Sequence, residues 1–196
     1  MKQFAEHCER NRGPILEILK RVFADRTSLL EIGSGTGQHA AYFAPGLPQL
    51  RWQPSDLAPN LPSIAAWAAE AGAPNLRAPI ELDVDRPFPP VEADAVFSAN
   101  TCHILSWPRV ERMFAGIGAL LPAGGVLAVY GPFNYGGKPT AGSNARFDAW
   151  LRGRDPASGL RDAEAVVALA RRHGMELKED NAMPANNRLL VWRRRA

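Results

Sequence analysis

Cysteine is scarce in this sequence, and long apolar runs are absent. The two cysteines, Cys8 and Cys102, are too few for a disulfide framework or, alone, for a structural zinc site. The four histidines show no ligand-like spacing with them, so no metal is expected. No stretch approaches the roughly 18 apolar residues that a membrane-spanning helix needs, and 1–14 lack the apolar core of a secretion signal. We therefore expect a reducing, cytoplasmic setting without membrane contact.

A strong excess of charge of either sign is also absent. The formal net charge is +3 in 196 residues, which is weak evidence for any polyanionic partner. The most basic run, at 193–195, could contact RNA, but a solvated strand end is the preferred interpretation. We expect no nucleic-acid partner, and the oligomeric state stays open. The length and the 46% hydrophobic content predict one globular domain over 1–196.

Apolar runs and helical patterns alternate along most of the chain. Helical spacing of apolar residues predicts an amphipathic helix after Pro14. Alternation of this kind is typical of a parallel sheet with helices on both faces. Further helices are predicted at 38–44, 63–71 and 110–121, and buried strands at 28–32, 50–54, 76–82, 93–98 and 125–130.

The last third of the chain departs from this repeat. A loop rich in Gly, Pro and Asn is expected at 131–144, before a short helix near 147–151. Asp162 is expected to cap a helix at 163–172. Two strands, 175–179 and 189–192, then form a hairpin. The predicted fold is Rossmann-like α/β, with a mostly parallel seven-stranded sheet that ends in an antiparallel hairpin.

A glycine-rich loop follows the first predicted strand, in LLEIGSGTGQ (29–38). Glycine lets a strand turn sharply into a helix while the backbone approaches a ligand closely. Dinucleotide-binding loops use G-x-G-x-x-G, whereas these glycines follow G-x-G-x-G, two positions after an acidic residue. A carboxylate suits the ammonium group of S-adenosylmethionine and is poorly placed beside a pyrophosphate. The loop therefore favours S-adenosylmethionine over NAD, with these predicted contacts: Glu31, Gly33, Ser34, Gly35 and Gly37.

Two more carboxylates follow the next predicted strands. Asp56 can accept hydrogen bonds from both ribose hydroxyls, and Asp83 can accept one from the adenine amino group. Ligands of open α/β sheets bind where the carboxyl ends of the strands meet. We therefore predict that both residues, with their neighbours Leu57 and Val84, bind the cofactor. The alternative role of each carboxylate, as a turn or helix cap, stays open.

These motifs resemble a family of small class I methyltransferase-like proteins, the methyltransferase-like protein 26 family. The resemblance covers nearly the whole chain, and SGTGQHA with WQPSD is specific. Gly33 is a departure, because many members carry alanine there. The resemblance implies the class I fold and S-adenosylmethionine binding, and it names no substrate. The matching segments are ERNRGPIL (9–16), LEIGSGTGQHAAYFA (30–44), WQPSDL (52–57), LDV (82–84), NTCHILSW (100–107), YGPFNYGG (130–137), SNARFDAWLRGRDPASGLRD (143–162) and MPANN (183–187).

Two residues are predicted to be catalytic. Methyl transfer mainly requires donor and acceptor to be close and aligned, which contributes up to ~7–11 kcal/mol. His103, after the fourth strand, is the candidate general base; the alternative is a histidine stacked on Trp107. Tyr135, after the fifth strand, could wall the acceptor pocket or face the sulfonium; the alternative is ordinary packing of a lid.

Two further residues are predicted to hold the amino-acid part of the donor. Asn100 could hydrogen-bond to it, and Arg12, before the first predicted helix, could pair with its carboxylate. A salt bridge at the helix end is the alternative for Arg12. Asn186 and Asn187, in the final turn, have no assigned role.

The sequence thus predicts an S-adenosylmethionine-dependent methyltransferase that acts on a small molecule. The absence of an N/D-P-P-Y/F motif disfavours nucleobase or protein amines as acceptors. The alternative is a protein that binds S-adenosylmethionine without turnover. An NAD-dependent oxidoreductase is disfavoured by the glycine spacing, and nothing singles out spermidine synthase-like chemistry.

Overall fold

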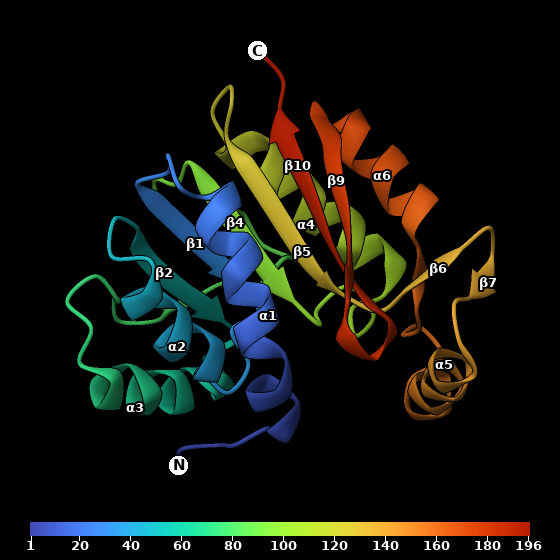
Figure 1. The fold of residues 1–196 in the computed structure, drawn as a ribbon, viewed down its shortest axis with the longest axis horizontal. Helices are drawn as coiled ribbons and strands as arrows, with labels where there is room; N and C mark the ends of the chain where they lie inside the picture. The colour runs from blue at the N-terminus through green and yellow to red at the C-terminus, as the bar shows by residue number, and fades with distance from the viewer.

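The computed structural model describes residues 1–196, which fold around a seven-stranded sheet (Figure 1). The strand order is β3-β2-β1-β4-β5-β10-β9. Only β10 runs antiparallel to its neighbours, β5 and β9, so the predicted parallel sheet with a final hairpin is confirmed. The strands are β1 (Ser28–Ile32), β2 (Arg51–Asp56), β3 (Ile80–Glu81), β4 (Ala95–Ala99), β5 (Val126–Gly131), β9 (Met175–Met183) and β10 (Asn187–Arg194).

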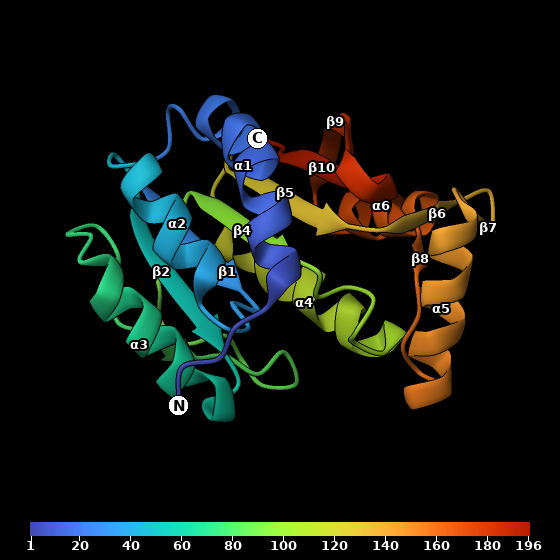
Figure 2. The ribbon, with the colours of Figure 1, turned by 60° about the horizontal axis from the view of Figure 1, so that its bottom comes forward.

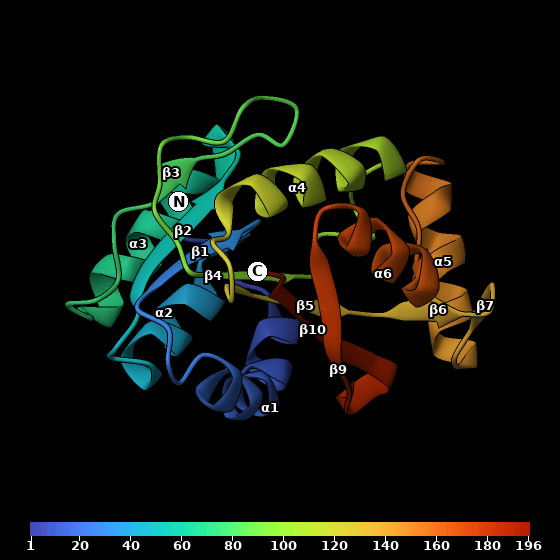
Figure 3. The same cartoon turned by 90° about the horizontal axis from the view of Figure 1, so that it is seen from above.

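Helices cover both faces of this sheet, as the sequence predicts (Figure 3). Alternate side chains of β5 enter two different cores: Leu127 packs with α4 and α6, whereas Ala128 packs with α1 and α2. None of the helices combines the length and the apolar character needed to cross a membrane. The helices are α1 (Glu6–Val22), α2 (Gln38–Gly46), α3 (Leu61–Ala71), α4 (Trp107–Leu120), α5 (Gly142–Arg154) and α6 (Ala163–Arg172), with short 3-10 turns at Ala58–Asn60 and Pro184–Asn186.

The first helix begins well before Pro14, where the sequence analysis placed its start. Pro14 lies inside α1, although its ring removes one helical hydrogen bond. The residues before it continue the buried face of the helix, because Cys8 and Asn11 are buried in line with Ile15 and Leu19. Packing of this face carries the helix through the proline.

The third strand is shorter than predicted. Only Ile80 and Glu81 pair with β2, and Leu76 adds an isolated bridge to Trp52. β3 lies at the edge of the sheet. Pro79 has no backbone N–H to donate to a ladder, which explains why the predicted strand at 76–82 is reduced to its end.

The predicted loop at 131–144 contains structure that the sequence analysis missed. β6 (Phe133–Tyr135), β7 (Lys138–Pro139) and β8 (Arg161–Asp162) form a second, three-stranded sheet. The helix that follows, α5, is longer than the predicted 147–151. α6 starts after Asp162 as predicted, but the Asp162 side chain makes no capping hydrogen bond.

The carboxyl ends of the parallel strands meet at one edge of the main sheet. In Figure 1 the arrowheads of β1, β2, β4 and β5 point to the lower edge, near the N-terminal part of α1. α5 stands at the end of the molecule opposite α3, next to the small sheet (Figures 1 and 2). This edge is therefore bordered by α1, by the segment after β4, by α5 and by the β9–β10 turn.

Candidate functional site

Two neighbouring cavities open at the carboxyl edge of the sheet. The small cavity has a volume of about 430 Å³ and the large cavity about 780 Å³; ligand sites of roughly 300–1,000 Å³ are common. His7, Asn100 and Ile104 line both cavities and form their shared wall. Among its lining residues the small cavity has Gly33, Ser34, Gly35, Asp56, Leu57, Leu82 and Val84, and the large cavity has His103, Tyr130, Phe147, Trp150, Arg154 and Asn186.

The glycine loop divides into positions that face the small cavity and positions that serve packing. Gly33 and Ser34 donate backbone hydrogen bonds to the Ser55 carbonyl, both at 3.0 Å, which fixes the loop on β2. Gly35 has φ +58° and no atom within 4 Å of the position of a Cβ, so its backbone is open toward the small cavity. Gly37 (φ +97°) does not line that cavity, because a Cβ there would lie 2.7 Å from the Ile64 Cα. Gly37 thus permits α2 to pack on α3.

Asp56 lies where β2 ends and lines the small cavity, as predicted. One carboxylate oxygen accepts a hydrogen bond from the Gly35 N–H at 2.7 Å. The other accepts bonds from the Leu57 N–H at 2.7 Å and the Asn60 side chain at 2.8 Å. A carboxylate has about four acceptor positions, so Asp56 braces the loop and retains capacity for a ligand hydroxyl.

Glu31 does not line the small cavity, although it was predicted to contact the cofactor. Its carboxyl group is buried behind the glycine loop and accepts a hydrogen bond from the Trp52 indole at 3.0 Å. Burial raises the pKa of Glu31 to about 7, while the bonds from Trp52 and Ser34 act in the opposite direction.

Asp83 is also turned away from the small cavity. Its carboxylate forms an ion pair with Arg109 at 3.0 Å and accepts a bond from the Asp85 N–H at 3.0 Å. The neighbouring apolar side chains, Leu82 and Val84, do line the cavity. The segment after β3 therefore presents an apolar surface where a carboxylate contact was predicted, and the predicted contact of Val84 with the cofactor stays a prediction.

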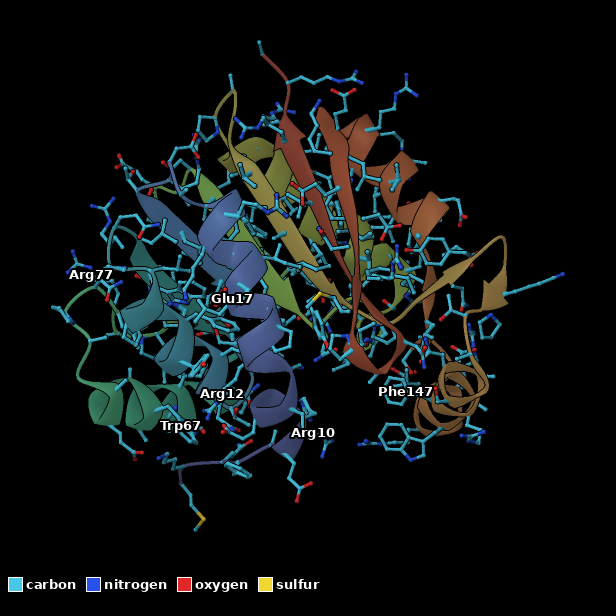
Figure 4. All side chains as sticks on the ribbon, viewed as in Figure 1. Arg10, Arg12, Glu17, Trp67, Arg77 and Phe147 are labelled. Carbon is cyan, nitrogen blue, oxygen red and sulfur yellow. The ribbon has the colours of Figure 1, made fainter.

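Arg12 is the clearest correction. Its guanidinium pairs with Glu9 at 2.7 Å and lies over the Tyr42 ring at 4.4 Å, and it lines neither cavity. In Figure 4 the Arg12 side chain extends from α1 toward α2. The helical period explains this, because the face of α1 that reaches the cavities carries His7 and Asn11.

The segment before α1 passes the start of α3 (Figure 2), and its residues Gln3 and Ala5 line the small cavity. The Gln3 N–H donates to the Ser63 hydroxyl, and the Gln3 carbonyl accepts from the Trp67 indole, both at 2.8 Å. Lys2 lies 3.6 Å from the centre of the Trp67 ring. Gln3 itself lines the cavity, so this segment contributes to its wall.

His103 lines the large cavity, but its aromatic neighbour differs from the expected one. Its ring meets Phe147 edge-on, with 5.3 Å between ring centres, so Trp107 is not the stacking partner. Burial lowers the pKa of His103 to about 4, and the charge of Arg161 adds to this effect. His103 is therefore neutral at physiological pH and a weak proton acceptor.

Tyr135, the second predicted catalytic residue, lies outside both cavities. Its hydroxyl donates to Asp180 at 2.8 Å, and Arg188 lies over its ring at 5.5 Å. Burial and the bond to Asp180 raise its pKa to about 12. The chain turns at Pro132 into β6, which carries Tyr135 away from the sheet edge.

Tyr130, which lies in β5 five residues before Tyr135, was not among the predicted site residues. Tyr130 lines the large cavity, and burial raises its pKa while a hydrogen bond from Asn11 acts in the opposite direction. Asn11 is itself held by His39 of α2, at 2.7 Å. Its position near the end of a buried strand could have predicted that Tyr130 lies at the edge of the sheet. Its contact with Asn11 of α1 could not be predicted from the sequence.

The far wall of the large cavity joins α5 to the β9–β10 turn. The Asn144 side chain donates to the Asn186 carbonyl at 3.0 Å and links these two elements. Asn100, Ala185 and Asn186 are the residues other than glycine with positive φ, between 57° and 59°, and all three line this cavity. Uncommon backbone conformations of this kind tend to gather at functional sites.

Solved structures of methyltransferases resemble this chain. An O-methyltransferase family protein from Burkholderia thailandensis has a TM-score of 0.83 and 17% identity, over 94% of this chain and 56% of that chain. The S-adenosylmethionine-dependent methyltransferase SibL has a TM-score of 0.82 and 19% identity, over 96% and 56%. PigF with SAH has a TM-score of 0.79 and 17% identity, over 93% and 55%.

At these identities the likeness shows the fold, and it confirms the predicted Rossmann-like methyltransferase architecture. The chain spans little more than half the length of these three proteins. One family model matches residues 2–194, which is nearly the whole chain. The chain belongs to the family described as "Protein of unknown function (DUF938)".

Proposed function

We propose that this protein is an S-adenosylmethionine-dependent methyltransferase with a small-molecule acceptor. The observation that carries the proposal is the wall of His7, Asn100 and Ile104, which lines the small and the large cavity alike. A donor in one cavity and an acceptor in the other would meet beside these three residues, which border both cavities. Such alignment is the main requirement of methyl transfer. The resemblance to the methyltransferase-like protein 26 family and a cytoplasmic setting belong to the same proposal.

The small cavity has features that fit the donor. Gly35 leaves open space where a side chain would stand, and Asp56 can accept a hydrogen bond from a ribose hydroxyl. Leu82 and Val84 offer an apolar surface for adenine. Arg109 also lines the cavity, but it is paired with Asp83 and so is poorly available to a pyrophosphate. When bound, S-adenosylmethionine supplies a methyl group activated by its cationic sulfonium.

His7 is better suited than His103 to take a proton from an acceptor. His103 is buried, and its pKa of about 4 makes it a poor base for a hydroxyl group. His7 lines both cavities and has an exposed side chain, so it can pass a proton to solvent. Burial of part of its ring, with Arg10 nearby, lowers its pKa and keeps it neutral. We assign the proton-accepting role to His7 and a positioning role to His103.

Binding of S-adenosylmethionine without turnover is the second candidate, favoured by the lowered pKa of both His7 and His103. We would incubate the protein with methyl-deuterated S-adenosylmethionine and a metabolite extract, and follow labelled products by mass spectrometry. A labelled product that needs wild-type protein and is strongly reduced with Asp56→Asn supports the methyltransferase. Tight donor binding without any labelled product would favour the second candidate.

A further inference from the structure

Aromatic side chains form a continuous row along the large cavity. The row starts at His103, next in the chain to Ile104 of the shared wall, and the His103 ring centre lies 5.3 Å from that of Phe147. The Phe147 and Trp150 rings are nearly parallel, at 16°, with 5.8 Å between their centres. Arg154 ends the row, with its guanidinium 4.7 Å from the centre of the Trp150 ring. Phe147, Trp150 and Arg154 share one face of α5 because they lie three and four residues apart.

Trp150 is unusually exposed for a residue of its size. Its exposed fraction is 53%, and it lines the mouth of the large cavity instead of packing into either core of the sheet. Figure 4 shows the neighbouring Phe147 on the side of α5 that faces the β9–β10 turn. Exposed aromatic rings beside a cavity are typical of ligand-binding surfaces, since a ligand removes their apolar area from water.

Arg154 has no carboxylate within ion-pair distance, although one arginine of the same helix does. Arg152, on the same helix, pairs with Asp148 at 3.0 Å. Arg154 instead lies over Trp150 at the rim of the cavity. A guanidinium presents a planar fork of donors that matches a carboxylate. Its position at the end of the aromatic row leaves it free to pair with an anionic group of a ligand.

Because the proposed function makes the large cavity the acceptor site, we infer that it binds a planar aromatic molecule with an anionic group. The ring system lies against Phe147 and Trp150, and the anionic group pairs with Arg154. The atom to be methylated then points to the other end of the row, toward the shared wall. The row spans three successive contacts, which suits an acceptor of two or more rings.

A matched pair of probes tests this inference without requiring turnover. We would measure calorimetrically the binding of 6-hydroxy-2-naphthoate and of its neutral carboxamide, each with S-adenosylhomocysteine present. The acid should bind wild-type protein about tenfold more tightly than the amide. Arg154→Ala should remove most of this difference and leave amide binding unchanged. Arg146→Ala, on the same helix but outside the cavity, is the control and should preserve the difference.

Equal affinities of acid and amide, no effect of Arg154→Ala, or no binding of either probe would each overturn the inference. Trp150→Ala should weaken both probes, whereas Trp150→Phe should largely restore them. Donor binding is measured separately, so the two claims can fail independently. Naphthoate binding through Arg154 in a protein that does not bind S-adenosylmethionine would retain the ligand class and refute the proposed methyl transfer.

Discussion

The Nε2 atom of His39 lies 2.7 Å from the Oδ1 atom of Asn11, in the buried contact between α2 and α1. An amide oxygen can only accept, so Nε2 of His39 carries the proton. The amide nitrogen of Asn11 is then available to donate to Tyr130, in agreement with its effect on the pKa of that residue. This relay leaves the Tyr130 hydroxyl proton free to donate into the large cavity.

His39 should make the protein sensitive to acid. Burial lowers its pKa in the folded state from 6.5 to about 3. The neutral form therefore stabilises the fold above pH 6.5, and this contribution is lost by about 1.4 kcal/mol per pH unit as the pH falls below it. We expect the stability difference between wild type and His39→Gln to shrink from pH 7 to pH 4 in urea titrations. A constant difference over that range would contradict this assignment.

Glu31 should have the opposite dependence on pH. Its folded pKa is raised from 4.5 to about 7, so its contribution is complete below pH 4.5 and is lost as the pH rises toward 7. Glu31→Gln keeps an acceptor for the Trp52 indole. Relative to wild type, this variant should gain about 1.4 kcal/mol per pH unit between pH 4.5 and 7. The free energy of unfolding, measured across that range, should show no such gain if Glu31 is already ionised in the folded protein.

Two tyrosines close in sequence should behave differently when the hydroxyl is removed. Tyr130→Phe removes the group that the Asn11–His39 pair orients into the large cavity, so acceptor affinity or turnover should fall. Tyr135→Phe removes an exposed bond to Asp180 and should cost about 1 kcal/mol of stability without changing the rate. Steady-state kinetics of the two variants with one acceptor make the comparison. A larger kinetic effect at Tyr135 would place the reaction elsewhere.

Alanine substitutions at Gly35 and Gly37 should have different effects, the first mainly on donor binding and the second mainly on stability. An alanine at Gly37 would combine strain at φ +97° with a Cβ 2.7 Å from the Ile64 backbone, costing about 2–4 kcal/mol of stability. At Gly35 the Cβ has room, so the cost should be about 1 kcal/mol. There, however, the methyl group enters the small cavity and should weaken donor binding. Denaturation and calorimetry on both variants test this, and an unstable Gly35→Ala with normal donor affinity would contradict it.

The sequence was sufficient to predict those helices and strands whose position is decided by a single local feature. β1 and β5 are fully buried runs, and Gly72 ends α3 in the left-handed conformation. The positions of Asp56 and Asn100 beside the cavities followed from the rule that parallel strands present their carboxyl ends on one edge.

Tertiary contacts decided the features that the sequence could not predict. The direction of the Arg12 side chain depends on how far α1 extends through Pro14. α5 has few large apolar residues among its arginines, glycines and polar residues, so its helical period is weak and the helix was predicted too short. The side chains of Glu31 and Asp83 were placed wrongly, because the position of a residue in a strand does not show its partner. Trp52 donates a hydrogen bond to Glu31, and Arg109 forms an ion pair with Asp83.

Calorimetric titration with S-adenosylmethionine, S-adenosylhomocysteine and NAD tests the central claim most directly. The two cavities with their shared wall predict micromolar binding of the first two ligands, weakened at least tenfold in Asp56→Asn, and no binding of NAD. Thermal unfolding of the variant would check that loss of the Asp56 brace has not unfolded the loop. Binding of NAD alone, or of none of the three, would contradict the assignment of the small cavity to a methyl donor.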